Sequence, residues 1–151
     1  MLFTEKRDAC RIVFYSDKYR MCMFMSIGYK MKRFFSNHAE TSDHHIDASL
    51  KTRYYKASKN TVIQELETYF NGSSDFSIHA SSEQHGEISA VSKRGKKVFI
   101  IATVIMVRPY YTALDFSVTT ETPLQIDFGY SNKIIKRMYQ HVNEQLPLIE
   151  G

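Results

Sequence analysis

The sequence has 151 residues and little cysteine, since it contains only Cys10 and Cys22. The spacing of the two matches no zinc or redox motif, and no cysteine follows residue 22. Secreted domains of this size are commonly stapled by several disulfides, so the pattern argues against that class of protein. We therefore expect a reduced, cytoplasmic setting, and the sequence predicts neither a metal nor a cofactor.

Tryptophan and long apolar runs are also missing. The longest apolar stretch, Val98 to Val107, is well short of the roughly 18 residues that a membrane-spanning helix needs. Hydrophobic residues nevertheless make up 43% of the chain, with ten Phe and ten Tyr, which is enough for the core of one domain. We expect no transmembrane segment, and the stretch is typical of a strand that is apolar on both faces.

Established catalytic motifs are absent, although Asp127-Phe128-Gly129 matches the tripeptide that holds magnesium in protein kinases. The Gly-rich loop, the strand lysine and the catalytic Asp loop of a kinase are not present. The tripeptide instead predicts a turn before a helix, with Gly129 in a backbone conformation that other residues resist. Phe128 is expected to pack under the helix start, while Asp127, Ser131 or Asn132 accepts hydrogen bonds from its free N–H groups.

Net charge is low over most of the chain. The total of +4 divides into +3 for residues 1–30 and +1 for the remainder, and five of the seven methionines lie between Met1 and Met31. Residues 1–30 show no sustained helical or strand period, and they lack the cleavage site of a signal peptide. We predict a poorly patterned extension over 1–30. One interpretation places the true translation start at Met31, and the alternative is a real, partly ordered segment.

Residues 31–50 are polar and rich in turn formers, which predicts a solvated linker. The histidines and aspartates of this segment also raise the question of a metal site. Their spacing fits no established ligand pattern, so we predict no metal here. The residues concerned are His38, Asp43, His44, His45 and Asp47.

Residues 51–151 carry clear periodicities. Two stretches repeat apolar residues at helical spacing, one with Val62, Leu66 and Phe70 and one from Ile134 to Leu146, which Pro147 ends. Five others read as strands, and short turns join the last four of them. The predicted order is strand, helix, four strands, helix, which gives a two-layer α+β domain with an antiparallel sheet and two amphipathic helices on one face. The expected strands are 51–57, 76–80, 87–93, 97–108 and 112–120.

The strand from Val98 to Val107 is apolar on both faces, whereas two helices comfortably cover only one. One alternating set of its side chains must therefore face a sister subunit, a partner protein or an apolar ligand. An N-terminal segment that covers this face is the alternative. The leading hypothesis is a non-catalytic interaction module, with a homodimer or a protein partner. The set is Phe99, Ile101, Thr103, Ile105 and Val107, or its alternates.

A second hypothesis is a binder of polyanions, either nucleic acid or an anionic membrane surface. The densest basic segment is the hairpin turn from Lys93 to Lys97, and the start of the last helix can also attract an anion such as phosphate. A solvated turn and ordinary helix capping explain the same residues. The candidate anion-binding residues are Lys93, Arg94, Lys96, Lys97, Ser131, Asn132 and Lys133.

The third hypothesis is an enzyme, for which the sequence names no substrate. His79 and Asp115 would form an acid–base pair if their strands were neighbours and both side chains lay on the exposed face. Exposed polar positions on an amphipathic sheet give the same pattern, so no catalytic residue is assigned.

Several segments together resemble a family of small uncharacterised cytosolic proteins of bacilli, over about residues 31–151. These are MKRFFSNHAET, KTRYYKASKN, GEISAVSKRGKKVFIIATVIMVRPYYTALDFSVTTET and DFGYSNKIIKRMYQHVNEQLP. The stretch with Asp127-Phe128-Gly129, Asn132 and the basic helix is more loosely similar to a bacterial domain family of unknown function, with one extra residue between Gly129 and Asn132. The resemblance supports the fold class and the cytoplasmic setting, and implies no activity, cofactor or catalytic residue.

Overall fold

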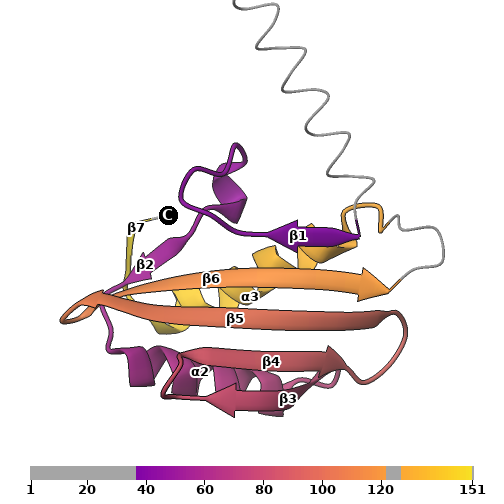
Figure 1. Ribbon diagram of the computed structural model, residues 1–151, viewed down its shortest axis with the longest axis horizontal. Coiled ribbons are helices and arrows are strands. Elements are labelled where there is room, and N and C mark those ends of the chain that lie inside the picture. The colour runs from indigo at the N-terminus through magenta and orange to yellow at the C-terminus, as the bar shows by residue number, and fades with distance from the viewer. Residues whose placement is uncertain (1–36, 122–126, 151) are drawn as a thin grey trace, which may run out of the picture. The chain divides into compact units, whose positions relative to one another are not determined.

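The computed structural model describes residues 37–121 and 127–150 (Figure 1). The chain divides into two units, Met1–Phe34 and Phe35–Gly151, and all described residues belong to the second. The predictions for residues 1–30, including a start at Met31, therefore lie outside the described residues.

One antiparallel sheet, with α2 and α3 packed on the same side of it, forms the described domain (Figure 1). The strand order is β3-β4-β5-β6-β2-β7, and β1 pairs with β6 beside β2. This confirms the predicted α+β class and the antiparallel sheet. In chain order the elements are β1 (His38–Glu40), the short 3₁₀ helix η1 (Ala48–Leu50), β2 (Arg53–Tyr55), α2 (Lys59–Gly72), β3 (Phe76–Ser82), β4 (Glu87–Ser92), β5 (Lys97–Arg108), β6 (Tyr111–Glu121), α3 (Tyr130–Gln145) and β7 (Leu148–Glu150).

The segment predicted as a solvated linker contributes two of these elements. β1 aligns antiparallel with the second half of β6, where Ala39 lies opposite Val118 and is buried. η1 buries Leu50, and the Asp47 side chain caps it by accepting a hydrogen bond from the Ser49 amide. Residues 37–50 are therefore part of the domain. The strand-helix-four strands-helix order is correspondingly incomplete, because it omits β1 and β7.

Both helices bury one apolar stripe, as their periodicity predicts. Ser58 is the N-cap of α2 and accepts a hydrogen bond from the Thr61 amide at 3.2 Å. The buried residues are Val62, Ile63, Leu66 and Phe70 of α2, and Ser131, Ile134, Ile135, Met138, Tyr139 and Val142 of α3. The Tyr139 hydroxyl donates to the Leu114 carbonyl at 2.9 Å, which ties α3 to the middle of the sheet. Burial of this phenol raises its pKa.

The faces of β5 differ. Val98, Ile100, Ala102 and Val104 alternate into the core beneath the helices. Their neighbours point to the opposite face, where Phe99 is 40% exposed and Ile105 is 53% exposed. The helices therefore cover one face of this strand and leave the other partly open, as the sequence predicts.

Candidate functional site

We call the side of the sheet opposite α2 and α3 the outer face; it faces the viewer in Figure 1. Its centre is an uncharged row on β5, formed by Phe99, Ile101, Thr103 and Ile105. The flanking positions carry mostly small side chains, so the β5 row stands above its neighbours. The small ones are Ser89 and Val91 on β4, and Ala113, Ser117 and Thr119 on β6, whereas the positions opposite Thr103 carry the carboxylates of Glu87 on β4 and Asp115 on β6.

Stacked side chains border the outer face near the turn between β5 and β6. The guanidinium carbon of Arg108 lies 4.3 Å from the centroid of the Tyr111 ring. Tyr111 stacks on Tyr54 of β2 with 4.9 Å between ring centroids. The Tyr54 hydroxyl donates to Asp43 Oδ1 at 2.8 Å, and this hydrogen bond, together with burial, raises the pKa of Tyr54 to about 12. The stack of Arg108, Tyr111 and Tyr54 thus forms an aromatic border of the outer face.

Asp115 lies on the outer face of β6, where β1 ends and β2 begins. Its Oδ1 accepts hydrogen bonds from the hydroxyls of Thr41, at 2.8 Å, and Thr52, at 2.6 Å. One carboxylate thus closes the loop between β1 and β2. Burial raises the pKa of Asp115, although both threonine hydroxyls oppose the shift.

The hypothetical acid–base pair of His79 and Asp115 is not formed. β4 and β5 lie between their strands, which separates the two by roughly 14 Å at the usual strand spacing. His79 lies instead at the irregularity between β3 and β4, with its ring centroid 6.4 Å from that of Phe99. Periodicity does not reveal strand order, so the sequence could not show this separation.

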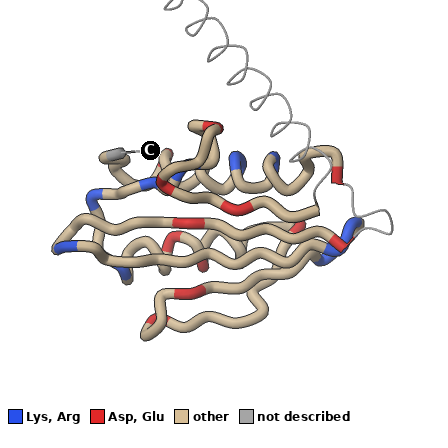
Figure 2. Tube along the Cα trace, turned by 45° about the horizontal axis from the view of Figure 1, so that its top comes forward, with Lys and Arg blue, Asp and Glu red and all other residues tan. Residues whose placement is uncertain are grey.

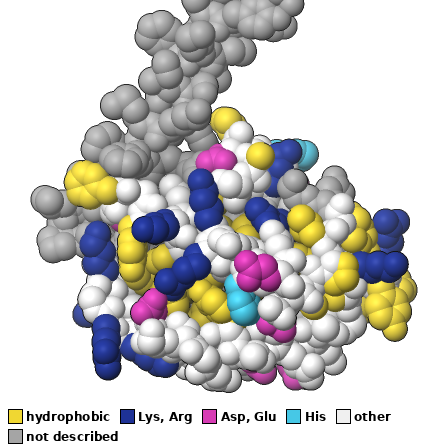
Figure 3. Space-filling model, turned by 180° about the vertical axis from the view of Figure 1, so that it is seen from behind, with side chains coloured by type: hydrophobic (Ala, Val, Ile, Leu, Met, Phe, Trp, Pro, Cys, Tyr) yellow, Lys and Arg dark blue, Asp and Glu magenta, His cyan; other side chains and the backbone are white. Residues whose placement is uncertain are grey.

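The fold brings the basic hairpin next to α3. Lys96 Nζ lies 5.1 Å from the centroid of the Tyr130 ring, at the first turn of that helix. We call the resulting surface the basic end; it lies at the turn between β4 and β5 in Figure 2 and at the left of the helix layer in Figure 3. The basic end has seven cations, and in the described part of the chain two of them form ion pairs. Lys97 pairs with Glu121 at 3.6 Å, and Arg137 pairs with Asp75 at 3.1 Å. The cations are Lys93, Arg94, Lys96, Lys97, Lys133, Lys136 and Arg137.

The turn before α3 is confirmed, but its anion site is already filled by the chain itself. The buried Asp127 carboxylate accepts hydrogen bonds from the amides of Gly129, at 2.8 Å, and Ser131, at 2.9 Å, and from the Ser131 hydroxyl. Gly129 adopts the expected left-handed conformation, with φ of 76°. Ser131 therefore serves the turn, and the helix start offers a phosphate little.

Two details of that turn differ from the sequence prediction. Phe128 does not pack under the helix start, since it is 62% exposed, and its own φ is 55°. In the described part of the chain, Asn132 Oδ1 is buried without a hydrogen-bond partner. Ser131 is thus not placed to meet an anion from solvent, whereas Asn132 is half-buried and Lys133 lies on the exposed side of α3.

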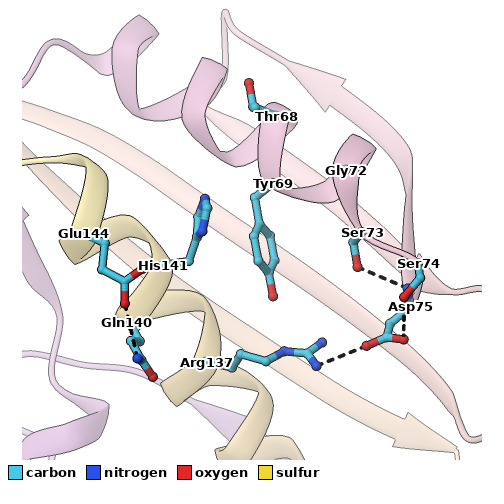
Figure 4. A pocket seen from close by; sticks show the side chains of 10 residues that line it. All are labelled: Thr68, Tyr69, Gly72, Ser73, Ser74, Asp75, Arg137, Gln140, His141 and Glu144. Carbon is cyan, nitrogen blue, oxygen red and sulfur yellow. Dashed lines mark hydrogen bonds and ion pairs between the residues drawn. The ribbon is translucent and has the colours of Figure 1, made fainter.

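A groove of about 580 Å³ runs between α2 and α3, and Figure 4 shows the side chains that line it. The Tyr69 ring lies between His141, 4.7 Å away between ring centroids, and Arg137. His141 Nε2 lies 3.1 Å from Glu65 Oε1, and Arg137 pairs with Asp75. His141 and Glu65 join α3 to α2, and Arg137 joins α3 to Asp75 in the connection after α2, which favours a structural tie over a reactive centre.

Sequence reasoning did not single out this groove. The available signal was the spacing of Arg137 and His141, which places both on one side of α3. Their partners Asp75 and Glu65 lie more than 60 positions away in the sequence, so only the fold joins them.

Searches with this chain against protein-family models and against curated proteins found no match. No helix within the described ranges is long and apolar enough to cross a membrane. Over those ranges no group of three or more His, Cys, Asp or Glu side chains is arranged to hold a metal ion. The resemblance to proteins of bacilli remains a prediction.

Proposed function

We propose that this domain is a non-catalytic interaction module whose binding surface is the outer face of its sheet. The observation that carries the proposal is the uncharged row on β5, where Phe99 and Ile105 are partly exposed at the centre of a wide sheet. Contiguous exposed apolar side chains with a polar rim are typical of protein-binding surfaces. The rim here includes Glu40, Lys97 and Arg108.

The shape of the outer face favours a second copy of this chain as its occupant. The β5 row stands between flanks on β4 and β6 whose side chains are small, except for the carboxylates of Glu87 and Asp115 opposite Thr103. A raised row fits against a lower flank. Two copies related by a twofold axis can therefore each place the β5 row against a flank of the other copy. A self-complementary surface is what an isologous interface requires.

The area available is sufficient for a stable dimer. Strands β3, β4, β5 and β6 have 7, 6, 12 and 11 residues, and at about 3.4 Å per residue and about 4.8 Å between strands they present roughly 590 Å² on each copy. Two copies would bury roughly 1,200 Å², which is at the lower end of the usual range for a specific interface. The outer face is thus large enough to form a specific protein–protein interface.

Light scattering after size-exclusion chromatography tests this proposal. The chain is expected to have twice the monomer mass, and the double variant Phe99→Asp/Ile105→Asp is expected to elute as a monomer because it buries two carboxylates in the interface. Both positions are partly exposed, so the variant should keep its circular dichroism spectrum.

Ile46→Asp is the matched control, because Ile46 is 63% exposed but lies in the loop between β1 and β2, away from the β5 row. It should leave the dimer intact. A chain that is monomeric at all concentrations, or a dimer that Ile46→Asp disrupts as strongly as the double variant, overturns the proposal.

A further inference from the structure

The basic end is held in place by contacts among segments that are distant in the sequence. The Lys93 amide donates to the Asp75 carbonyl at 2.7 Å, and Lys93 Nζ donates to the Ser73 carbonyl at 2.7 Å. Arg137 of α3 reaches the Asp75 carboxylate at 3.1 Å. The hairpin, the connection between α2 and β3, and α3 therefore converge on Asp75, so Lys93 and Arg137 are held in position before any ligand arrives.

The exposed side of α3 extends this surface. Tyr130, Lys133 and Arg137 follow at helical spacing along one side, with Lys136 beside them. Lys133 and Arg137 are about 6 Å apart along the helix axis, comparable to the step between successive phosphates of an extended strand. A row of cations at this spacing suits a phosphodiester chain better than an isolated phosphate.

Aromatic side chains lie beside the cations. Tyr130 is 38% exposed, and its ring is the one that Lys96 approaches. Exposed aromatic rings in a basic surface provide stacking positions for unpaired bases. We propose that the basic end binds single-stranded nucleic acid, with Lys133 and Lys136 on the phosphates, Arg137 beside them in its ion pair with Asp75, and Tyr130 stacked on a base.

The distribution of apolar side chains favours nucleic acid over an anionic membrane. Met106, Val107 and Tyr110 are exposed together at the turn between β5 and β6, whereas the exposed apolar side chains at the start of α3 are the aromatic rings of Phe128 and Tyr130. The basic hairpin lies at the other end of β5, a strand about 40 Å long (Figure 1). A bilayer would draw the cations and the insertable side chains to the same end.

Binding should be measured by fluorescence anisotropy with labelled oligo-dT and oligo-U of about 20 nucleotides, between about 50 and 200 mM salt. The affinity should fall linearly with salt on logarithmic axes. Lys133→Glu/Lys136→Glu should weaken binding at least about tenfold and flatten that slope. Tyr130→Ala should weaken it about tenfold, whereas Tyr130→Phe keeps the ring and should bind like the unaltered chain.

Lys51→Glu/Lys56→Glu is the matched control, because it changes the net charge equally but lies near β2. All variants keep residues 1–30, so the net charge of +3 in that segment contributes equally to each. Salt-independent binding, or equal losses in both double variants, overturns the proposal. Binding to vesicles of phosphatidylserine without binding to either oligonucleotide also overturns it and assigns the surface to lipid.

Discussion

Asp115 is the clearest case of a single residue that organises the outer face. Its carboxylate holds both ends of the loop between β1 and β2 through Thr41 and Thr52, and burial is the main reason that its pKa is raised. An acid with a raised pKa binds its proton more tightly in the folded than in the unfolded chain. It therefore adds stability below its unfolded pKa of 3.8, and this contribution is lost as the pH rises through the folded pKa.

We expect Asp115→Asn to remove this dependence, because the amide oxygen still accepts from both hydroxyls but does not titrate. The free energy of unfolding of the unaltered chain minus that of the variant should fall as the pH rises above the unfolded pKa of 3.8, and should level off above the raised folded pKa. Urea unfolding of both proteins at several pH values measures this difference in the free energy of unfolding. Thr52→Val removes a hydroxyl that lowers the pKa of Asp115, so it should extend the window to higher pH. A difference that is flat or increases with pH would contradict the assignment.

Elements with long periodic patterns were predicted well from the sequence, whereas of the three short strands only β2 was expected. α2, α3 and the strands β4 to β6 each bury two or more residues at a fixed period, and β3 alternates apolar and polar residues, so each pattern is visible locally. β1 and β7 have three residues each, and β1 buries only Ala39. Their positions depend on the free edges of β6 and β2, which exist only once the sheet has formed.

The turns at the two ends of β4 provide a matched test at the scale of elements. Gly86 and Gly95 have nearly the same φ, 75° and 76°. A Cβ at Gly86 would lie 2.2 Å from the Val104 carbonyl oxygen, whereas one at Gly95 would meet nothing within 4 Å. The two alanine variants therefore share the conformational penalty and differ in the clash.

Gly95→Ala should lower the free energy of unfolding by about 1 kcal/mol, through backbone strain alone. Gly86→Ala should lower it by about 3 kcal/mol, because the β3–β4 turn must also move away from β5. Denaturant unfolding of both variants gives the comparison. Equal losses would show that the close approach of Gly86 to β5 contributes nothing to stability.

At the scale of the whole molecule, the sequence indicated two candidate surfaces but not how they are assembled. The continuous apolar run of β5 predicted an open apolar face, because a strand that is apolar on both faces needs a second cover besides the two helices. The basic hairpin was also evident, whereas its contact with Tyr130 of α3 depends on the return of the chain after β6. The helix start that was predicted to attract an anion is occupied by a side chain of the protein itself, because the Asp127 carboxylate accepts hydrogen bonds from its amides.

The central claim is that the outer face, and not the helix layer, meets a second copy of the chain. Adjacent isoleucines on β5 provide an internal comparison, because Ile100 is buried under the helices while Ile101 faces outward. Methyl-labelled isoleucine spectra recorded over a dilution series would follow both at once. We predict that the methyl signals of Ile101 and Ile105 shift with concentration while that of Ile100 stays constant. Signals that do not shift, or shifts confined to isoleucines of the helix layer such as Ile63 and Ile135, would contradict the account.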